Sequence, residues 1–317
     1  MLLGIPFSVG AAVVVVLGVD LDRTAAILRT ADVGWLAIAL VALGVQVVVR
    51  AARWRLLLPS DGPDRVALAR IVPVALVGYL GNAVLPARLG DALRGVILAR
   101  RESLPTAETV GSVILERVLD TLVLASVGIG AALAIGVADW IVGAAFVGVV
   151  VSFVGLVVLT AAPRVLARIR IERLRLLIHV LERLVHGADV THRRQRLVGA
   201  IGLCLIAWAL DAALYWLVAA AIGFELAPAG AVLVSALTVL STAIPSAPGY
   251  VGTFELAAVA ATGAIGIDPS TGLAFALVAH AVAILPIAGA GTVALAALGR
   301  DVRLAGAERA VLGGGAA

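Results

Sequence analysis

Charged residues and cysteine are scarce in this sequence of 317 residues. Only 14% of the residues are charged and 62% are hydrophobic, whereas about a quarter of the residues of a soluble domain are charged. These proportions exclude a soluble globular protein and predict a polytopic membrane protein. The single cysteine, Cys204, can form neither an internal disulfide framework nor a cysteine metal site. Lysine is absent, so all 24 basic residues are arginines.

Long apolar segments predict six membrane-spanning helices, because about 20 apolar residues cross a hydrocarbon core of about 30 Å. They cover roughly residues 2–19, 33–49, 118–138, 141–162, 197–222 and 272–298. Two further apolar segments, 71–85 and 231–266, are interrupted by proline and glycine. The first 19 residues lack a basic start and a small-residue cleavage site, so we expect a retained helix rather than a signal peptide. The expected fold is a single all-α membrane domain over residues 1–317, with six to eight spanning helices.

The positions of the arginines predict the topology, because arginines in short loops accumulate on the cytoplasmic side of a membrane. Twenty-two of the 24 arginines fall within residues 50–70, 88–117, 164–196 or after residue 298. These segments share one side only if residues 71–85 enter and leave as a re-entrant hairpin from the cytoplasm. Both termini would then also be cytoplasmic. For residues 231–266, a re-entrant hairpin from outside and two full crossings fit equally well.

The two interrupted segments suggest an inverted repeat. Pro86 and Gly90 match Pro245 and Gly249 at an offset of 159 residues, half the length of the chain. Broken helices at corresponding positions of two halves are typical of transporter binding sites, although proline and glycine are common in membrane helices and the match could be chance.

The repeat halves would be residues 1–162 and 197–298. Between them, residues 163–196 carry leucines at helical spacing and predict an amphipathic helix in the headgroup plane. Its arginines would either attract anionic lipid or simply form a solvated face.

The first break is followed by charged residues. Arg88, Asp91 and Arg94 are three residues apart and lie near one face of a helix. Because a guanidinium matches phosphate or carboxylate in a bidentate manner, Arg88 and Arg94 are candidate anion ligands, and Asp91 would orient one of them. Asn82, at the start of this segment, is a further candidate. The alternative is that cytoplasmic arginines extend toward the membrane interface.

Glu116, Arg117 and Asp120 are expected to open the next spanning helix, and they carry a surplus carboxylate. This carboxylate would pair with Arg88 or Arg94 and hold the first hairpin against the bundle. The pairing is either a fixed structural contact or a network that breaks and reforms as substrate moves.

The second break is also a candidate polar site, because non-helical backbone at membrane depth needs polar partners. Ser246, Gly249 and Gly252 could present a hydroxyl and backbone amides to a phosphate, since a helix restarts near Gly252 with its positive dipole end toward the gap. Glu255 fits a helix-capping position at least as well as a ligand position.

Other polar residues within apolar segments give weaker signals. Asp211 is costly at membrane depth and would be either a proton-coupling carboxylate or the partner of an arginine elsewhere. His280 is more readily a packing residue than a ligand. A stripe of hydroxyl side chains would line a path or pack between helices; it comprises Ser235, Thr238, Ser241 and Thr242.

Three runs together resemble the transmembrane region of lysylphosphatidylglycerol synthase, also called the flippase-like domain. They are Asn82-x-x-Leu-Pro-x-Arg-x-Gly-Asp-x-x-Arg94, Glu116-Arg-x-x-Asp120 and Pro245-Ser-x-Pro-Gly-x-x-Gly-Thr-Phe-Glu255. The resemblance covers most of the chain and implies a bacterial inner-membrane protein associated with lipid translocation. Asp91 stands where the family usually has glutamate, and Tyr250 stands where a second glycine is common. The sequence stops at Ala317 without the aminoacyl-transferase domain, so we expect a stand-alone member that cannot make lysyl-lipid by itself.

The leading hypothesis is a lipid flippase that moves a phospholipid or a polyprenyl-phosphate lipid between leaflets. It would be a transporter rather than an enzyme, without cofactor, metal or nucleic-acid partner. Its expected binding residues are Asn82, Arg88, Asp91, Arg94, Glu116, Arg117, Asp120, Ser246, Gly249, Gly252 and Glu255, with Asp211 for coupling.

Two other classes of function compete with transport. One is a membrane transferase that acts on a lipid-phosphate donor, with Asp120, Glu116 or Asp211 as the general base. The other is a non-catalytic accessory subunit that holds lipid for a neighbouring envelope enzyme. A homo-oligomer is compatible with each of the three.

Overall fold

The computed structural model describes residues 4–59, 64, 66–85, 88–137, 143, 150, 154, 194–242 and 246–313. In this part of the chain every regular element is a helix. The expected all-α class is therefore confirmed. The helices are α1 (Gly4–Leu17), α2 (Leu21–Arg29), α3 (Val33–Leu57), α5 (Leu68–Val84), α6 (Leu89–Glu102), α7 (Thr106–Ile135), α10 (Arg194–Ala221), α11 (Pro228–Ser241), the 3-10 turn η4 (Pro248–Tyr250), α12 (Thr253–Gly263) and α13 (Pro269–Gly313).

Four of these helices, α3, α7, α10 and α13, are long and apolar enough to cross a membrane. A fifth span results if α1 and α2, which meet at 88°, count as one bent crossing. Four of the six predicted segments thus correspond to long helices, and residues 2–19 fall on the shorter α1. The predicted span at 141–162 and the predicted interfacial helix at 163–196 lie essentially outside the described residues.

Three helices extend well beyond their apolar segments. The helix α13 runs to Gly313 instead of ending at Leu298. The helix α3 continues to Leu57 instead of ending at Val49, and α7 begins at Thr106, twelve residues before the expected start at Val118. Several charged residues expected in loops or at helix starts are therefore inside long helices. Those that face the interior of the bundle in α3 and α7 are paired with opposite charges on neighbouring helices, as described below.

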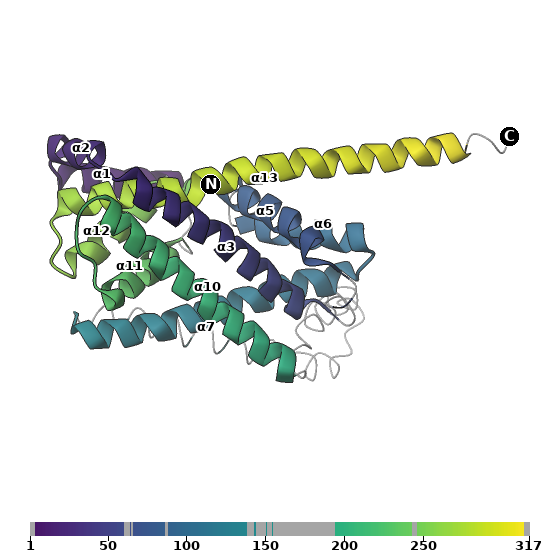
Figure 1. Ribbon diagram of the computed structural model, residues 1–317, viewed down its shortest axis with the longest axis horizontal. Coiled ribbons are helices and arrows are strands. Elements are labelled where there is room, and N and C mark those ends of the chain that lie inside the picture. Colours follow the sequence, from purple (N-terminus) through teal and green to yellow (C-terminus); the bar gives the residue numbers. More distant parts are fainter. Residues whose placement is uncertain are drawn as a thin grey trace.

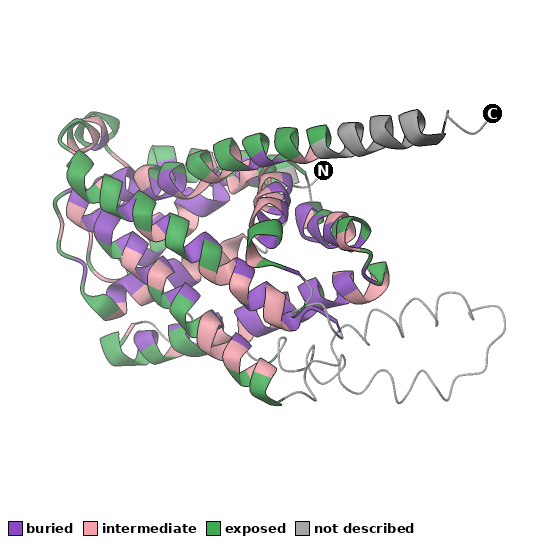
Figure 2. Cartoon of the chain, turned by 45° about the vertical axis from the view of Figure 1, so that its right-hand side comes forward, coloured by how far each residue is buried: buried purple, intermediate pink, exposed green. Residues whose placement is uncertain are grey.

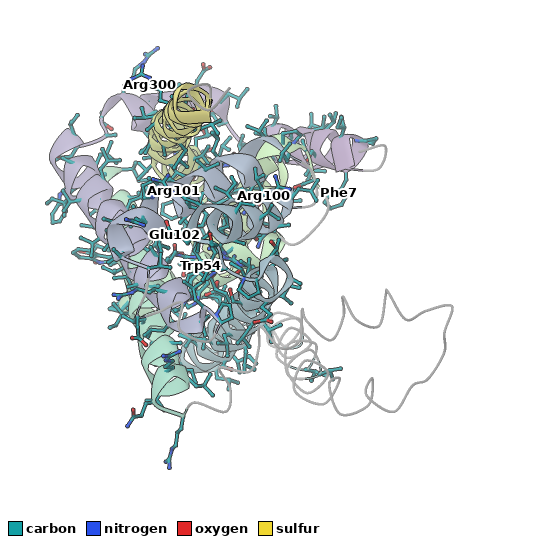
Figure 3. All side chains as sticks on the ribbon, turned by 90° about the vertical axis from the view of Figure 1, so that its right-hand side faces the viewer. Phe7, Trp54, Arg100, Arg101, Glu102 and Arg300 are labelled. Atoms are coloured by element: carbon teal, nitrogen blue, oxygen red, sulfur yellow. The ribbon has the colours of Figure 1, made fainter. Side chains whose placement is uncertain are left out.

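The surface of the bundle is largely apolar. Figure 2 shows that exposed residues gather on the outward faces of the helices while buried residues face neighbouring helices. Leu17, Val33 and Val293 are 81%, 75% and 70% exposed, and Phe7 points outward at the edge of the view along the long axis (Figure 3). A surface of this kind suits a hydrocarbon solvent, because a soluble monomer rarely exposes large continuous apolar patches.

Two helical hairpins enter the bundle from opposite ends (Figure 1). The first hairpin is α5 and α6, and both of its outer ends pack near the C-terminal end of α3, where Trp54, Leu58, Ile71 and Leu98 share one core cluster. The second hairpin is α11 and α12. Its outer ends lie together at the opposite end of the bundle, near the start of α3.

Polar contacts tie that opposite end together. The backbone N–H of Asp32, before α3, donates to the carbonyl of Ala221 at the end of α10 over 2.7 Å. Arg23 of α2 forms an ion pair with Asp268 over 3.2 Å, just before α13 begins. The Thr271 hydroxyl donates a hydrogen bond to the Asp268 carboxylate and thereby holds the pKa of that carboxylate below its usual value.

Candidate functional site

The inner tips of the two hairpins meet in the middle of the bundle. Arg88, at the start of α6, donates a hydrogen bond to the hydroxyl of Thr242 at the end of α11. The Arg88 guanidinium also lies over the ring of Tyr250, 5.7 Å from its centroid. Both Arg88 and Tyr250 have left-handed backbone conformations, with φ of 53° and 61°, which are uncommon for residues with a side chain and cluster at functional sites.

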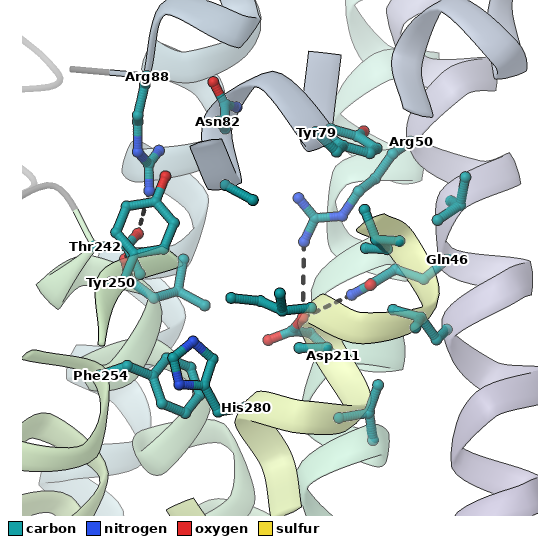
Figure 4. Close-up of a pocket in the computed structure, with 18 of the residues that line it drawn as sticks. Gln46, Arg50, Tyr79, Asn82, Arg88, Asp211, Thr242, Tyr250, Phe254 and His280 are labelled. Carbon is teal, nitrogen blue, oxygen red and sulfur yellow. Dashed lines mark hydrogen bonds and ion pairs between the residues drawn. The ribbon is translucent and has the colours of Figure 1, made fainter. Parts of the chain in front are cut away.

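A cavity of about 220 Å³ opens between the tips and the long helices (Figure 4). Its wall combines arginines and other polar side chains with aromatic and aliphatic ones. Arg88, Tyr250 and Thr242 lie on one side in Figure 4, and Arg50, Gln46 and Asp211 lie on the other. The polar and aromatic residues that line it are Gln46, Arg50, Tyr79, Asn82, Arg88, Arg117, Asp211, Tyr215, Thr242, Tyr250, Phe254 and His280.

Asp211 forms the anionic wall of this cavity. Its Oδ1 accepts a hydrogen bond from the Gln46 amide over 2.7 Å and lies 3.8 Å from the guanidinium of Arg50. The Arg50 guanidinium stacks over the Trp208 ring, 4.6 Å from the centroid. The expectation that Asp211 pairs with an arginine is confirmed, whereas its coupling role remains a prediction. Its Oδ2 is buried without a hydrogen-bond partner among the described residues.

A second charged group, largely buried, lies beside the cavity. Arg53 of α3 donates to both Glu116 and Asp120 of α7, and its side chain has no exposed surface. Arg94 of α6 donates to the other oxygen of Glu116 over 2.8 Å and stacks over the Trp54 ring at 4.6 Å. The expected pairing of an α7 carboxylate with an arginine of the first hairpin is thus confirmed for Arg94.

Arg117 joins this group to the cavity. Its guanidinium lies 3.6 Å from Asp91 of the first hairpin and 3.5 Å from Asp120, and 28% of its side chain is exposed on the cavity side. Three arginines thus face three carboxylates, so the buried group is neutral as a whole. Arg94 is enclosed within it and does not line the cavity. We name this group the buried charge cluster: Arg53, Asp91, Arg94, Glu116, Arg117 and Asp120.

Arg88 differs from those arginines. Its side chain lines the cavity, and no carboxylate within the described part of the chain lies at ion-pair distance from it. Asn82, from the same hairpin, lines the cavity and accepts the backbone N–H of Asp91 through its Oδ1 over 3.1 Å. Asn82 therefore helps to fix the start of α6, which carries Arg88.

The residues expected at the second break serve mainly to shape its tip. Glu255 accepts the backbone N–H of Gly252 over 2.7 Å, which confirms the capping interpretation and also occupies that amide. Gly249 offers its carbonyl to His280 over 2.8 Å, so His280 is more than a packing residue. Ser246 is half-buried and does not line the cavity described above.

Sequence reasoning missed the contribution of α3. Arg50 and Arg53 lie beyond the predicted end of the apolar segment at Val49, and Gln46 is an isolated polar residue within that segment. Their spacing of i, i+4 and i+7 places them on one face of a continued helix, so extending the helix by two turns would have found them. Tyr79 of α5 has no comparable signal in the sequence.

Apolar helices around a charged internal cavity define a multi-pass membrane protein with a buried polar site. Comparison with known families identifies the family: the family model of the lysylphosphatidylglycerol synthase TM region matches residues 1–291. The chain belongs to this family, as its three sequence runs indicated.

Among curated proteins, the chain is 28% identical over 332 aligned residues to a protein of Haloferax volcanii named Glycosyltransferase AglD. The alignment covers 91% of this chain and 53% of that relative, so the chain spans about half of its length. No solved structure matches the chain.

Proposed function

We propose that the protein binds the phosphate of a lipid headgroup in the cavity between the hairpin tips and moves that lipid between the leaflets of the membrane. The observation that carries the proposal is Arg88, a cavity-lining arginine without a carboxylate partner in the described structure. A guanidinium without a counter-charge at membrane depth raises the free energy of the folded protein unless water or an anion accompanies it. A phosphate accepts two hydrogen bonds from such a group.

The charge balance of the surroundings supports an anionic ligand. The buried charge cluster is neutral, and Arg50 is opposed by Asp211 at 3.8 Å. Of the three arginines that line the cavity, Arg88 is the one with no carboxylate at ion-pair distance among the described residues, and Asp91 of the same hairpin acts on it electrostatically from further away. The aromatic and aliphatic remainder of the lining, including Leu43, Val47 and Ile287, would accommodate the apolar part of a lipid near its headgroup.

The arrangement of the hairpins supports movement rather than static binding. Two hairpins that enter from opposite ends and meet at one site fit the inverted repeat and the re-entrant topology that the sequence predicts, and such an arrangement is typical of alternating-access transporters. In this proposal, residues 1–162 and 197–298 are the repeat halves, the first hairpin enters from the cytoplasm, and both termini are cytoplasmic. The membrane would be the inner membrane of a bacterium.

A flip assay in proteoliposomes tests the proposal. Purified protein is reconstituted with fluorescently labelled phosphatidylglycerol, and dithionite then bleaches the label in the outer leaflet. We expect the protein to raise the bleached fraction above the half expected for empty vesicles. Arg88→Ala should return the bleached fraction to that level, whereas Arg100→Ala, which removes an exposed arginine of the same helix, should behave as wild type.

Equal bleaching with and without protein, or full activity of Arg88→Ala, would contradict the proposal. A labelled polyprenyl-phosphate lipid should be run in parallel.

A membrane transferase is the second candidate, because the Haloferax volcanii relative is named a glycosyltransferase. Asp211 is the cavity carboxylate with a free oxygen, whereas Glu116 and Asp120 are engaged by Arg53. Incubation of the purified protein with a glycosylated polyprenyl-phosphate donor, followed by mass spectrometry of the lipid, separates the two functions. Consumption of the donor would favour transfer. A stable co-purifying enzyme without intrinsic flipping would favour the accessory role.

A further inference from the structure

His280 of α13 lies between two hydrogen-bond acceptors of the second hairpin. Its Nδ1 is 2.5 Å from Oε1 of Glu255, and its Nε2 is 2.8 Å from the carbonyl oxygen of Gly249. The imidazole ring also stacks on the ring of Phe254, with centroids 4.2 Å apart. The ring is therefore fixed in position by three contacts with one short segment.

The two contacts require two protons. A carbonyl oxygen can only accept, so Nε2 must carry a hydrogen. The contact between Nδ1 and Glu255 needs a second proton, either on the ring or on the carboxyl group. If one proton leaves, a neutral imidazole faces an ionised carboxylate with a single hydrogen to share between two acceptors. One of the two contacts is then lost.

These contacts determine the shape of the second tip. Glu255 holds the backbone N–H of Gly252 with its other oxygen, over 2.7 Å, while His280 holds the carbonyl of Gly249. Tyr250 lies between those glycines and contacts Arg88 of the first hairpin. Loss of a proton from His280 and Glu255 would therefore loosen the point at which the two hairpins meet.

We propose that His280 and Glu255 form a proton-binding site that closes the second tip against the first when protonated and releases it when the proton passes to water in the cavity. This inference rests on the proposed function, because it assigns the control of the same cavity. The other titratable or charged groups that line the cavity around His280 are Arg50 of α3, Tyr79 of α5, Arg88 of the first hairpin, Arg117 of α7, Asp211 and Tyr215 of α10, and Tyr250 of η4.

Electron paramagnetic resonance can measure the closure without any lipid substrate. Spin labels are attached at Val84→Cys and Val251→Cys, one at each tip, where the native side chains are 59% and 56% exposed. The background is Cys204→Ala in the full chain. We expect a short, narrow distance distribution at pH 5 and a longer, broader one at pH 8, because deprotonation removes a contact that holds the second tip.

Variants of the pair make this expectation specific. Glu255→Gln can still accept from Gly252 and can donate to Nδ1 of a neutral His280, so the distribution should stay short at both pH values. His280→Gln should abolish the pH response. Glu225→Gln, which changes an exposed carboxylate elsewhere, should retain it. A distance that does not respond to pH in the parent protein, or a full response in His280→Gln, would overturn the inference. A clear response in a protein that fails to flip lipid would instead count against the proposed function alone.

Discussion

At the scale of single residues, Arg53 and Arg88 show two different environments for an arginine inside a membrane protein. Arg53 is completely buried and is hydrogen-bonded to two carboxylates of α7. Arg88 is half-buried and has a left-handed backbone conformation, and within the described part of the chain its guanidinium donates to a neutral hydroxyl. The first arrangement stabilises a helix contact, whereas the second leaves hydrogen-bonding capacity available to a ligand.

Replacement of Arg53 should destabilise the whole bundle. In Arg53→Met the side-chain volume is largely kept, but Glu116 and Asp120 lose a shared counter-charge in a buried site. Breaking a buried ion pair typically costs about 3–5 kcal/mol. We expect a clearly lower unfolding temperature in detergent, measured by thermal denaturation, and partial recovery when Asp120→Asn is added.

An exposed arginine provides the control for that experiment. Arg100→Met should unfold near the wild-type temperature, since substitutions at exposed positions usually change stability by less than about 0.5 kcal/mol. If Arg53→Met were as stable as Arg100→Met, the buried charge cluster would not be a stabilising element.

At the scale of elements, the first hairpin depends on close backbone contact. Gly78 and Gly81 of α5 face α6, and a Cβ at Gly90 would overlap the carbonyl oxygen of Gly78 and the backbone nitrogen of Asn82. Small residues at such positions let helices in a membrane approach closely. They also bring Arg94 against Gly78, which sets the distance to Glu116.

A single methyl group added at Gly90 should therefore force α5 and α6 apart. We expect Gly90→Ala to destabilise the protein by at least about 1–3 kcal/mol, the usual cost of overpacking, and to lower its unfolding temperature. Gly44→Ala is the matched control, because a Cβ there has no neighbour within 4 Å and alanine is the better helix former by roughly 0.5–1 kcal/mol. Equal stability of the two variants would show that the hairpin tolerates a wider spacing.

Local sequence signals predicted the elements of the hairpins better than the contacts between them. Glycine, proline and charge spacing predict the interruption of the two apolar segments 71–85 and 231–266, the capping role of Glu255 and the charged face of α6. The pairing of Arg53 with Glu116 and of His280 with Gly249 joins residues 63 and 31 positions apart. Such pairs depend on how helices pack, which no local pattern in a single sequence specifies. The ends of α3 and α7 were misplaced for the same reason, since their charges are neutralised only by neighbouring helices.

At the scale of the whole molecule, the two hairpins create a single internal site from opposite ends of the bundle. Neither hairpin alone surrounds the cavity: the first supplies Asn82 and Arg88, and the second supplies Thr242 and Tyr250. The long helices α3, α10 and α13 close the remaining sides.

Accessibility of introduced cysteines should reveal this arrangement. In a Cys204→Ala background, we place single cysteines at exposed positions that flank the first hairpin, Ala67 and Thr106, and the second hairpin, Ala227 and Ala264. A membrane-impermeant maleimide is then applied to intact cells and to broken membranes. Because each hairpin enters and leaves at one end, we expect positions 227 and 264 to react in intact cells and positions 67 and 106 to react only after the membrane is broken. Reaction of positions 67 and 106 from different sides would make residues 71–102 a full crossing, and the two ends of the cavity would then no longer be controlled by separate hairpins.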